Sequence, residues 1–176
     1  MTERQDRRIE KTRKTIRDTL LMEMKDLSYQ DLSVSKLCRD ANIGRGTFYL
    51  HYNDIYEVVQ EIEDKMLSDF RDITFRHFDL ETEFSDYLRD VLIYVENHRD
   101  AYEVFLLPSN SRYALQFREA AIDLFYYHAI KYQPKHDRTA LKYKTIKNYS
   151  GIAGVVEAWF HSGFAVSPDQ LIQFLK

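Results

Sequence analysis

Apolar side chains recur every three or four residues along almost the whole sequence, a period that matches the α-helix and little else. In 7–27 this period is carried by Ile9, Ile16, Leu20 and Met24, with arginine and lysine between them. No stretch alternates apolar and polar residues for long enough to predict a strand, and only five Gly and three Pro interrupt the chain. The sequence therefore predicts an all-α fold.

The same period gives the expected order of the helices. After the first helix we expect two short helices within 33–52 and then a longer one, capped by Asn53 or Asp54, that runs through Phe70. Further helices are expected at 84–98, 100–107, 112–132 and 138–163. A last helix is expected after Ser167, because serine is a good N-cap and Pro168 fits the first helical position. We predict an N-terminal domain at 1–53 and a C-terminal domain at 54–176.

The bulk composition describes a soluble globular protein, with 44% hydrophobic and 30% charged residues. No run reaches the roughly 18 uncharged apolar residues that a membrane span requires, so no membrane partner is expected. The first residues, MTERQDRRIEKTRKTIRD, lack the apolar core of a secretion signal. A lone cysteine, Cys38, excludes an internal disulfide and suits a reducing cytoplasm, where we expect it to be a small buried thiol rather than a reactive one.

The net charge of −3 hides an uneven distribution. Residues 1–53 carry eleven Lys and Arg against eight Asp and Glu, whereas residues 54–176 carry fourteen against twenty. The first seventeen residues alone hold seven basic and three acidic side chains. A basic N-terminal end on an acidic body is typical of a protein that contacts phosphates through its head. The alternative is a solvated helix face that carries charges of both signs.

The two short helices within 33–52 have the dimensions of a helix-turn-helix. Ser33 is a fair N-cap for the first helix, VSKLCRDA, and Asn42 tolerates the left-handed conformation that often ends a helix. Small side chains at Cys38 and Ala41 let two helices cross closely. In the second helix, at about 45–52, we expect the aromatic residues Phe48 and Tyr52 to turn back to the core. The alternative is an ordinary pair of short helices with a mixed surface.

The start of the second short helix, GRGTFYLHY, then leaves several side chains facing outward. Gly46 is a poor helix former and costs roughly 1 kcal/mol against alanine, so its position requires a reason, which close approach to DNA supplies. Arg45 can donate two hydrogen bonds to guanine, and Thr47 can bond a phosphate or meet a thymine methyl. The remaining faces belong to Tyr49, Leu50 and His51, of which the tyrosine and the histidine can donate to phosphates.

The stretch SVSKLCRDANIGRGTFYLHYNDIYEVV resembles the DNA-binding signature of the TetR family of transcriptional regulators. Members have a short helix with a small residue, a Gly or Asn turn, and then Thr-hydrophobic-Tyr-x-His/Tyr-Phe/Tyr before a fourth helix. The resemblance covers about residues 8–70, and GIAGVVEAWFHSGFAVSPDQLIQFL is similar to the end of one C-terminal subgroup. It implies a three-helix DNA-binding domain, joined by a long helix to a helical bundle for ligand binding and dimerisation.

Carried over by position, the resemblance implies phosphate contacts from the start of the first short helix, at Ser33, Ser35 and Lys36. The base-facing residues would be Arg45, Gly46 and Thr47, with Tyr49 and His51 on the phosphate backbone and Leu50 beside them. The sequence departs from the family at the start of the fourth helix, where many members have a lysine and this chain has Ile55. One phosphate contact is then lost, or is replaced by a basic arm of Arg7, Arg8, Lys11 and Arg13.

The resemblance also implies a homodimer that binds a palindromic DNA operator and is released from it by a small-molecule effector. The best dimer face in the sequence is a helical stripe near the end of the chain: Ile152, Val155, Val156, Trp159 and Phe160. Gly151 and Gly154 on the same helix would permit close approach. The alternative is that this stripe packs only inside its own chain.

An effector pocket is expected among the aromatic residues, which make up 14% of the sequence. The segments that would surround it carry Phe70, Phe75, Tyr102, Phe105, Phe117 and Phe125, together with Phe78 and Tyr126. Taken one at a time, each of these side chains fits plain core better than a ligand contact. His77, His98 and His128 could bond a ligand or a partner, or else be solvated or capping residues. The effector itself cannot be named from the sequence, and no cofactor is implied.

Two other classes of function were weighed. The six histidines and one cysteine form no His-Glu-x-x-His motif or cysteine pair, and there is no phosphate-binding glycine loop and no Gly-x-Ser-x-Gly elbow. We therefore predict neither an enzyme nor a metal site. A TetR-like coactivator or sensor that acts through a protein partner remains the alternative to sequence-specific DNA binding, because of Ile55 and the acidic body.

Overall fold

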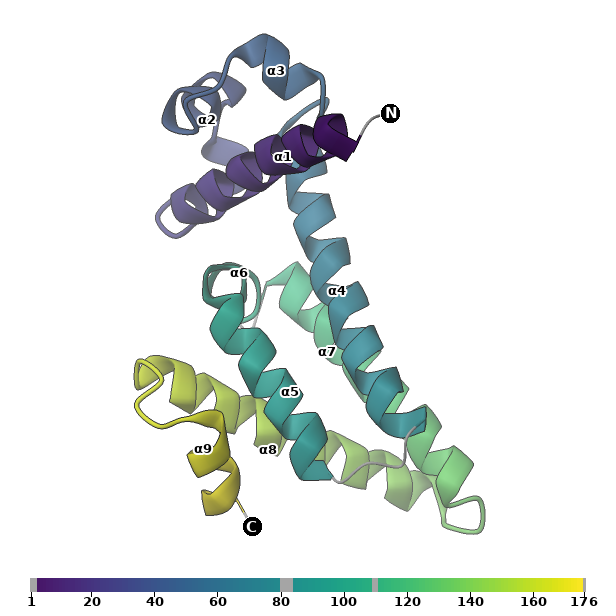
Figure 1. Ribbon diagram of the computed structural model, residues 1–176. Helices are drawn as coiled ribbons and strands as arrows, with labels where there is room; N and C mark the ends of the chain where they lie inside the picture. Colours follow the sequence, from purple (N-terminus) through teal and green to yellow (C-terminus); the bar gives the residue numbers. More distant parts are fainter. Residues whose placement is uncertain (1–2, 80–83, 109–110, 176) are drawn as a thin grey trace. The chain divides into compact units, whose positions relative to one another are not determined.

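A computed structural model describes residues 3–79, 84–108 and 111–175 of the chain (Figure 1). All regular secondary structure in these ranges is helical, which confirms the predicted fold class. The chain divides into two compact units, Met1–Leu67 and Ser68–Lys176. One long helix, α4 (Ile55–Asp79), begins in the first unit and ends in the second.

The N-terminal unit consists of short helices packed on one long one. It contains α1 (Glu3–Met24), the 3-10 helix η1 (Tyr29–Asp31), α2 (Val34–Asp40), α3 (Arg45–Tyr49) and the first half of α4. α1 packs against η1 and α2, and α2 packs against α3. The apolar faces of these helices meet in a core whose fully buried members are Ile16, Leu20, Leu37, Phe48 and Val58.

The first helix ends one turn earlier than its apolar period predicts. The helix ends at Met24. Leu27, which would continue the apolar period of 7–27 by one more step, is 42% exposed. The reason is local, because Ser28 caps the next element: its hydroxyl accepts a hydrogen bond from the Gln30 N–H at 3.3 Å. The helix instead begins earlier than expected, at Glu3.

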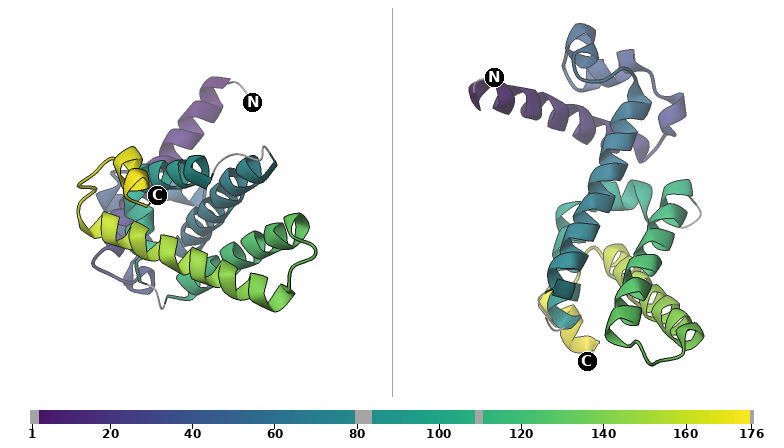
Figure 2. Two further views of the ribbon diagram at one scale, coloured as in Figure 1. Left: turned by 90° about the horizontal axis from the view of Figure 1, so that it is seen from below. Right: turned by 90° about the vertical axis from the view of Figure 1, so that its right-hand side faces the viewer.

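The C-terminal unit contains the end of α4 and five further helices. They are α5 (Phe84–Asn97), α6 (Arg99–Phe105), α7 (Arg112–Tyr132), α8 (Arg138–His161) and α9 (Pro168–Phe174). α5 packs against α6 and α9, while α7 packs along α8. Figure 2 shows α7 and α8 as a helical hairpin closed by the loop at 133–137. The bounds of α5, α6, α7 and α8 lie within two residues of the predicted ones, and α9 begins at Pro168 as predicted.

One apolar cluster holds α5, α8 and α9 together. Its buried members are Leu88, Leu92, Val95, Val156, Trp159 and Ile172. The Trp159 Nε1–H donates to the Val166 carbonyl at 2.8 Å, which fixes the segment before α9. The expected cap of α9 is confirmed: Ser167 accepts from the Gln170 N–H, the Gln170 side chain accepts from the Ser167 N–H, and proline follows the cap. In the described ranges, no helix has the length and apolar character that a bilayer crossing demands.

Candidate nucleic-acid interface and ligand cavity

A tight turn at 41–44 reverses the chain between α2 and α3. The N–H of Ile43 donates to the Cys38 carbonyl at 2.9 Å, and the N–H of Asn42 donates to the Arg39 carbonyl at 3.1 Å. This pair of hydrogen bonds is a Schellman motif, which requires one residue in the left-handed conformation. Asn42 supplies it with φ of 53°, as its position after the helix predicts. The sequence thus ends α2 sharply and starts α3 at a fixed angle.

The short helix α3 has one buried face and one outward face. Phe48 is completely buried and Tyr52 is 2% exposed, with their ring centroids 5.8 Å apart, which confirms their expected place in the core. The outward face holds Arg45, Gly46, Tyr49 and Leu50, with Thr47 and His51 half-buried at its edges. Leu50 is 80% exposed and Tyr49 is 58% exposed, unusual values for large apolar side chains.

Gly46 has no structural task inside this unit. A Cβ added at Gly46 would meet no atom within 4 Å. Because glycine within a helix costs roughly 1 kcal/mol relative to alanine, the fold alone would favour a larger residue here. Any requirement for glycine must come from a molecule that approaches this face from outside.

The expected phosphate contacts at the start of α2 are partly occupied by other interactions. The Ser33 hydroxyl accepts a hydrogen bond from the Lys36 N–H at 3.1 Å and so caps the helix. The Lys36 ammonium forms ion pairs with Glu23 and, at 3.1 Å, with Asp40. Ser35 is exposed. The structure therefore brings the three residues together, but the charge of Lys36 already has two carboxylate partners.

Known structures with this arrangement of helices were found by comparison. A scan against protein-family models gives no match, and a search of curated proteins gives no significant match. Solved structures match over nearly the whole chain. A TetR/AcrR-family regulator from Aquifex aeolicus is 18% identical with a TM-score of 0.70, over 93% of this chain and 95% of that one. A TetR regulator from Streptococcus agalactiae is 22% identical with a TM-score of 0.61, over 97% and 94%.

The same helices also match a regulator solved with a ligand. FadR from Bacillus subtilis, in complex with stearoyl-CoA, is 12% identical with a TM-score of 0.61, over 92% of this chain and 96% of that one. The chain has the TetR fold. At these identities the likeness establishes the fold, while the residues that would contact DNA or an effector must be argued from this chain itself.

The start of α4 differs from the pattern that many TetR members share. Ile55 is 6% exposed and belongs to the core, so the position that often holds a lysine is apolar here. The Asp54 carboxylate accepts from the Glu57 N–H at 2.9 Å, which decides between the two expected caps. The Glu57 carboxylate in turn accepts from the Asn53 N–H at 2.7 Å. The carboxylates of Asp54 and Glu57 therefore flank the position at which many members have a phosphate-binding lysine.

Glu61 on α4 collects two arginines from α1 of this TetR-fold chain. Its carboxylate accepts from Arg13 at 2.5 Å and from Arg17, which also bonds Glu10 at 2.6 Å. The Arg13 guanidinium lies 5.1 Å from the centre of the buried Tyr52 ring. We call Arg13, Arg17, Glu61 and Tyr52 the α1–α4 clamp. Since Arg13 is part of it, this member of the predicted basic arm is directed inward, whereas Arg8 and Lys11 are exposed.

The clamp shifts the pKa values of its members. Burial raises the pKa of Glu61 and is the largest single effect, but the hydrogen bonds from Arg13, Tyr52 and Arg17 and the charge of Arg13 together outweigh it, so that the pKa lies below the ordinary value of 4.5. Burial raises the pKa of Tyr52 to about 12, and the neighbouring Glu61 carboxylate adds to this shift. At neutral pH the clamp therefore consists of two guanidinium groups, one carboxylate and a neutral phenol.

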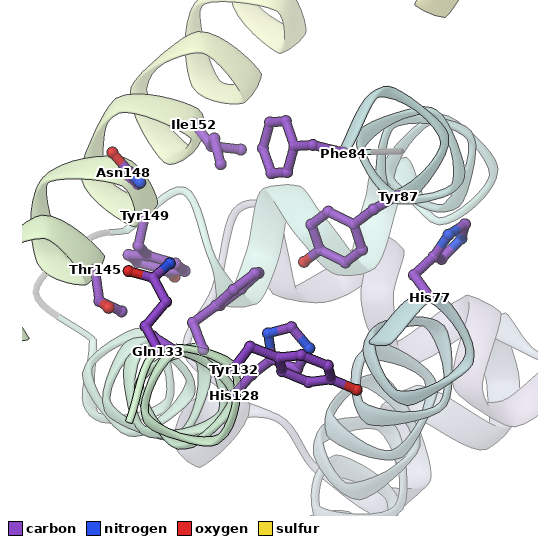
Figure 3. Close-up of a pocket in the computed structure, with 12 residues that line it drawn as sticks. His77, Phe84, Tyr87, His128, Tyr132, Gln133, Thr145, Asn148, Tyr149 and Ile152 are labelled. Carbon is purple, nitrogen blue, oxygen red and sulfur yellow. The ribbon is translucent and has the colours of Figure 1, made fainter. Parts of the chain in front are cut away.

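A cavity of about 650 Å³ lies between four helices of the C-terminal unit. It is lined by His77 of α4, Phe84 and Tyr87 of α5, Phe125, His128, Ala129 and Tyr132 of α7, Gln133, and Thr145, Asn148, Tyr149 and Ile152 of α8. Figure 3 shows Phe84 and Tyr87 facing the α8 side chains across this space. The volume is within the range of small-molecule sites, roughly 300–1,000 Å³.

Of the six aromatic residues expected at an effector pocket, Phe125 lines this cavity. The Phe70 ring packs against Phe125, with ring centroids 6.4 Å apart, and against Phe117, with ring centroids 4.9 Å apart. Phe105 is buried against Tyr113, Tyr102 packs against Phe160, and Phe75 is 47% exposed. Tyr126 is half-buried, and its hydroxyl donates to the Arg138 carbonyl at 3.2 Å. The Phe78 side chain lies outside the described residues.

The predicted dimer stripe on α8 is turned largely toward its own unit. Val156 and Trp159 are 4% and 3% exposed in the core beneath α5 and α9, so these two side chains are not available to a second copy. Ile152 is half-buried against the same cluster, and Phe160 is half-buried against Tyr102. Val155 is also half-buried. The apolar period of α8 thus reports burial within the chain at Val156 and Trp159.

Sequence reasoning missed the role of Glu61 and most of the cavity lining. Glu61 lies forty-eight residues from Arg13, and only the folded chain reveals that they meet. The cavity uses polar residues of α8 and the α7–α8 loop that carry no motif. His77 and His128 had been named as residues that could bond a ligand, and both line the cavity. His98 instead stacks on Tyr94, with ring centroids 4.1 Å apart.

Proposed function

We propose that this chain is a TetR-family transcriptional regulator that binds a palindromic DNA operator as a homodimer and is released by a small molecule. The outward face of α3 carries the proposal. Arg45, Gly46, Thr47, Tyr49 and Leu50 are presented on a helix whose other face is locked into the core by Phe48. A helix held in this way, with a guanidinium, a hydroxyl and a phenol at its surface, suits the major groove.

The homodimer is proposed because one copy of α3 can contact only a few base pairs. A helix of five residues offers few base contacts, so two copies on two half-sites are needed for a specific affinity. We expect light scattering during size exclusion to give twice the chain mass of 21.1 kDa at micromolar concentration. A mass of 21.1 kDa under these conditions would contradict the dimer.

The outward residues of α3 give the direct test of DNA binding. Thr47→Ala and Tyr49→Ala are each expected to weaken binding to the DNA upstream of its own gene about tenfold, since one base or phosphate contact is worth about 1–3 kcal/mol. Tyr127→Ala, an equally large truncation at a 67% exposed tyrosine of α7, serves as the control. Fluorescence anisotropy at fixed salt measures all three. Unchanged affinity in both α3 variants would refute the assignment of these residues.

A coactivator or sensor that acts through a protein partner is favoured by one specific observation. Asp54 and Glu57 make the start of α4 acidic, and the charge of Lys36 is already paired, which reduces the number of phosphate contacts. Salt dependence separates the two functions, because each neutralised phosphate contributes about −0.9 to the slope of log K against log salt concentration. We expect a steep negative slope for DNA. A slope near zero would favour the protein partner.

A further inference from the structure

We propose that the α4–α5–α7–α8 cavity binds an uncharged aromatic molecule that carries hydroxyl or carbonyl groups. The identification of this ligand as the effector rests on the proposed function, whereas its chemical class does not. The chemistry of the cavity wall carries it, in three steps: the aromatic walls, the polar groups and the charge.

Five of the twelve residues that line the cavity are Phe or Tyr. Phe84 and Tyr87 come from α5, Phe125 and Tyr132 from α7, and Tyr149 from α8, where it is half-buried. Tyr87 already packs edge-on against Phe125, with ring centroids 5.4 Å apart and planes at 82°. Rings in such an arrangement prefer an aromatic guest, because offset and edge-to-face contacts add about 0.5–1.5 kcal/mol beyond burial. A flexible alkyl chain gains no such contacts.

Neutral hydrogen-bonding groups interrupt this wall. Thr145 and Asn148 project from α8, and Gln133 follows the end of α7 (Figure 3). An amide both donates and accepts hydrogen bonds, so these side chains match hydroxyl and carbonyl groups. Because a polar group that is buried without a partner costs free energy, a purely apolar ligand would leave them poorly matched.

The charge of the wall argues against an ionic ligand. Among the described residues that line the cavity, none is Lys, Arg, Asp or Glu. The most basic groups in the wall are the imidazoles of His77 and His128. The Asp90 carboxylate lies 2.9 Å from His77 Nε2 and 3.6 Å from Arg76 Nη1. The His77 ring is therefore already paired with the Asp90 carboxylate. A buried organic anion or cation would lack a counter-charge, which is unfavourable.

The test compares 4-phenylphenol with three probes: biphenyl-4-carboxylate and 4-phenylbenzylamine carry a charged group on the same biphenyl, and 1-decanol keeps the hydroxyl but replaces the biphenyl by an alkyl chain. Isothermal titration calorimetry is carried out on the full chain at pH 7 without DNA. We expect 4-phenylphenol to bind at least tenfold more tightly than each of the other three probes. No binding of 4-phenylphenol, or tighter binding of the carboxylate, the amine or decanol, would overturn the proposal.

Two variants place the binding in the cavity. Ala129→Phe fills the space beside Phe125 and should weaken 4-phenylphenol binding at least tenfold, whereas Ala158→Phe, the same change at an exposed position of α8, should not. Asn148→Leu removes an amide from an exposed position. It should weaken the binding of 4-phenylphenol more than that of unsubstituted biphenyl, which is added as a fifth probe because it has no hydroxyl group. Circular dichroism checks that each variant is folded, and the loss must appear in at least one folded cavity variant.

The two proposals fail separately. If 4-phenylphenol binds as expected but the chain shows no salt-dependent affinity for DNA, the ligand class stands and the DNA-binding function falls. If the chain binds DNA and Ala129→Phe leaves 4-phenylphenol binding unchanged, the cavity assignment falls and the DNA-binding function stands.

Discussion

Gly46→Ala is expected to make the N-terminal unit more stable and its binding to DNA weaker. The stability gain, about 1 kcal/mol in the free energy of unfolding, follows from helix propensity, because the new Cβ would meet no atom of the unit. The loss of affinity follows from the proposed close approach of α3 to the major groove. We expect about a tenfold loss for alanine and about a hundredfold loss for Gly46→Leu, since each 1.4 kcal/mol of clash is a factor of ten.

The substitution is informative because it should raise the free energy of unfolding while it lowers the affinity for DNA. Stability is measured by urea denaturation and affinity by fluorescence anisotropy on the same preparations. Ser68→Ala is the control, because Ser68 is an exposed residue within α4 and alanine is again the better helix former. It should change stability without the graded loss of affinity. If Gly46→Leu binds DNA as tightly as the original chain, the outward face of α3 is not the surface that enters the groove.

Removing the charge at the centre of the α1–α4 clamp should produce the largest loss of stability. Glu61→Gln leaves Arg13 and Arg17 without their shared carboxylate. A hydrogen bond to a charged group contributes about 1.5–3 kcal/mol, but the amide oxygen of glutamine can still accept one bond and the side chains are partly exposed, which reduces the total loss. We expect a loss of about 1–3 kcal/mol in the free energy of unfolding. Asp18→Asn is the control, because it breaks an ion pair of α1 with Lys14 whose side chains are 56% and 67% exposed. Such surface pairs are worth at most about 1 kcal/mol.

The clamp also gives a defined pH dependence. The pKa of Glu61 is lower in the folded chain than its ordinary value of 4.5, so the unfolded chain binds the proton first as the pH falls. The stabilisation is therefore complete above the ordinary value and disappears as the pH falls through the folded-state pKa. Denaturation curves between pH 7 and pH 3.5 should show Glu61→Gln approaching the original chain at the acid end. A constant difference across this range would contradict the pKa direction.

The helices were predictable from the sequence because their signals are local. The period of apolar residues, the caps at Ser33 and Ser167, and Asn42 at the end of α2 each act within one or two turns of the chain. The division of α3 into a core face and an outward face followed from the same spacing, and the burial of Phe48 and Tyr52 confirms it.

The features that could not be predicted depend on residues far apart in the chain. The clamp pairs α1 with α4, and the cavity draws on four helices whose approach no local rule specifies. A period alone also cannot tell which neighbour an apolar stripe meets. The period of α8 is therefore compatible with a dimer face, whereas in the structure α5 and α9 of the same chain cover Val156 and Trp159.

Trp159 gives the molecule a built-in optical reporter of one unit. It is the single tryptophan of the sequence, it is 3% exposed, and its ring packs edge-on against Phe164 with centroids 4.6 Å apart. Its emission should therefore shift to the red when the core of α5, α8 and α9 opens and water reaches the indole ring. Unfolding of the N-terminal helices alone should leave the emission unchanged. Recording tryptophan emission together with far-ultraviolet circular dichroism would show in one experiment whether the two units unfold together or in succession.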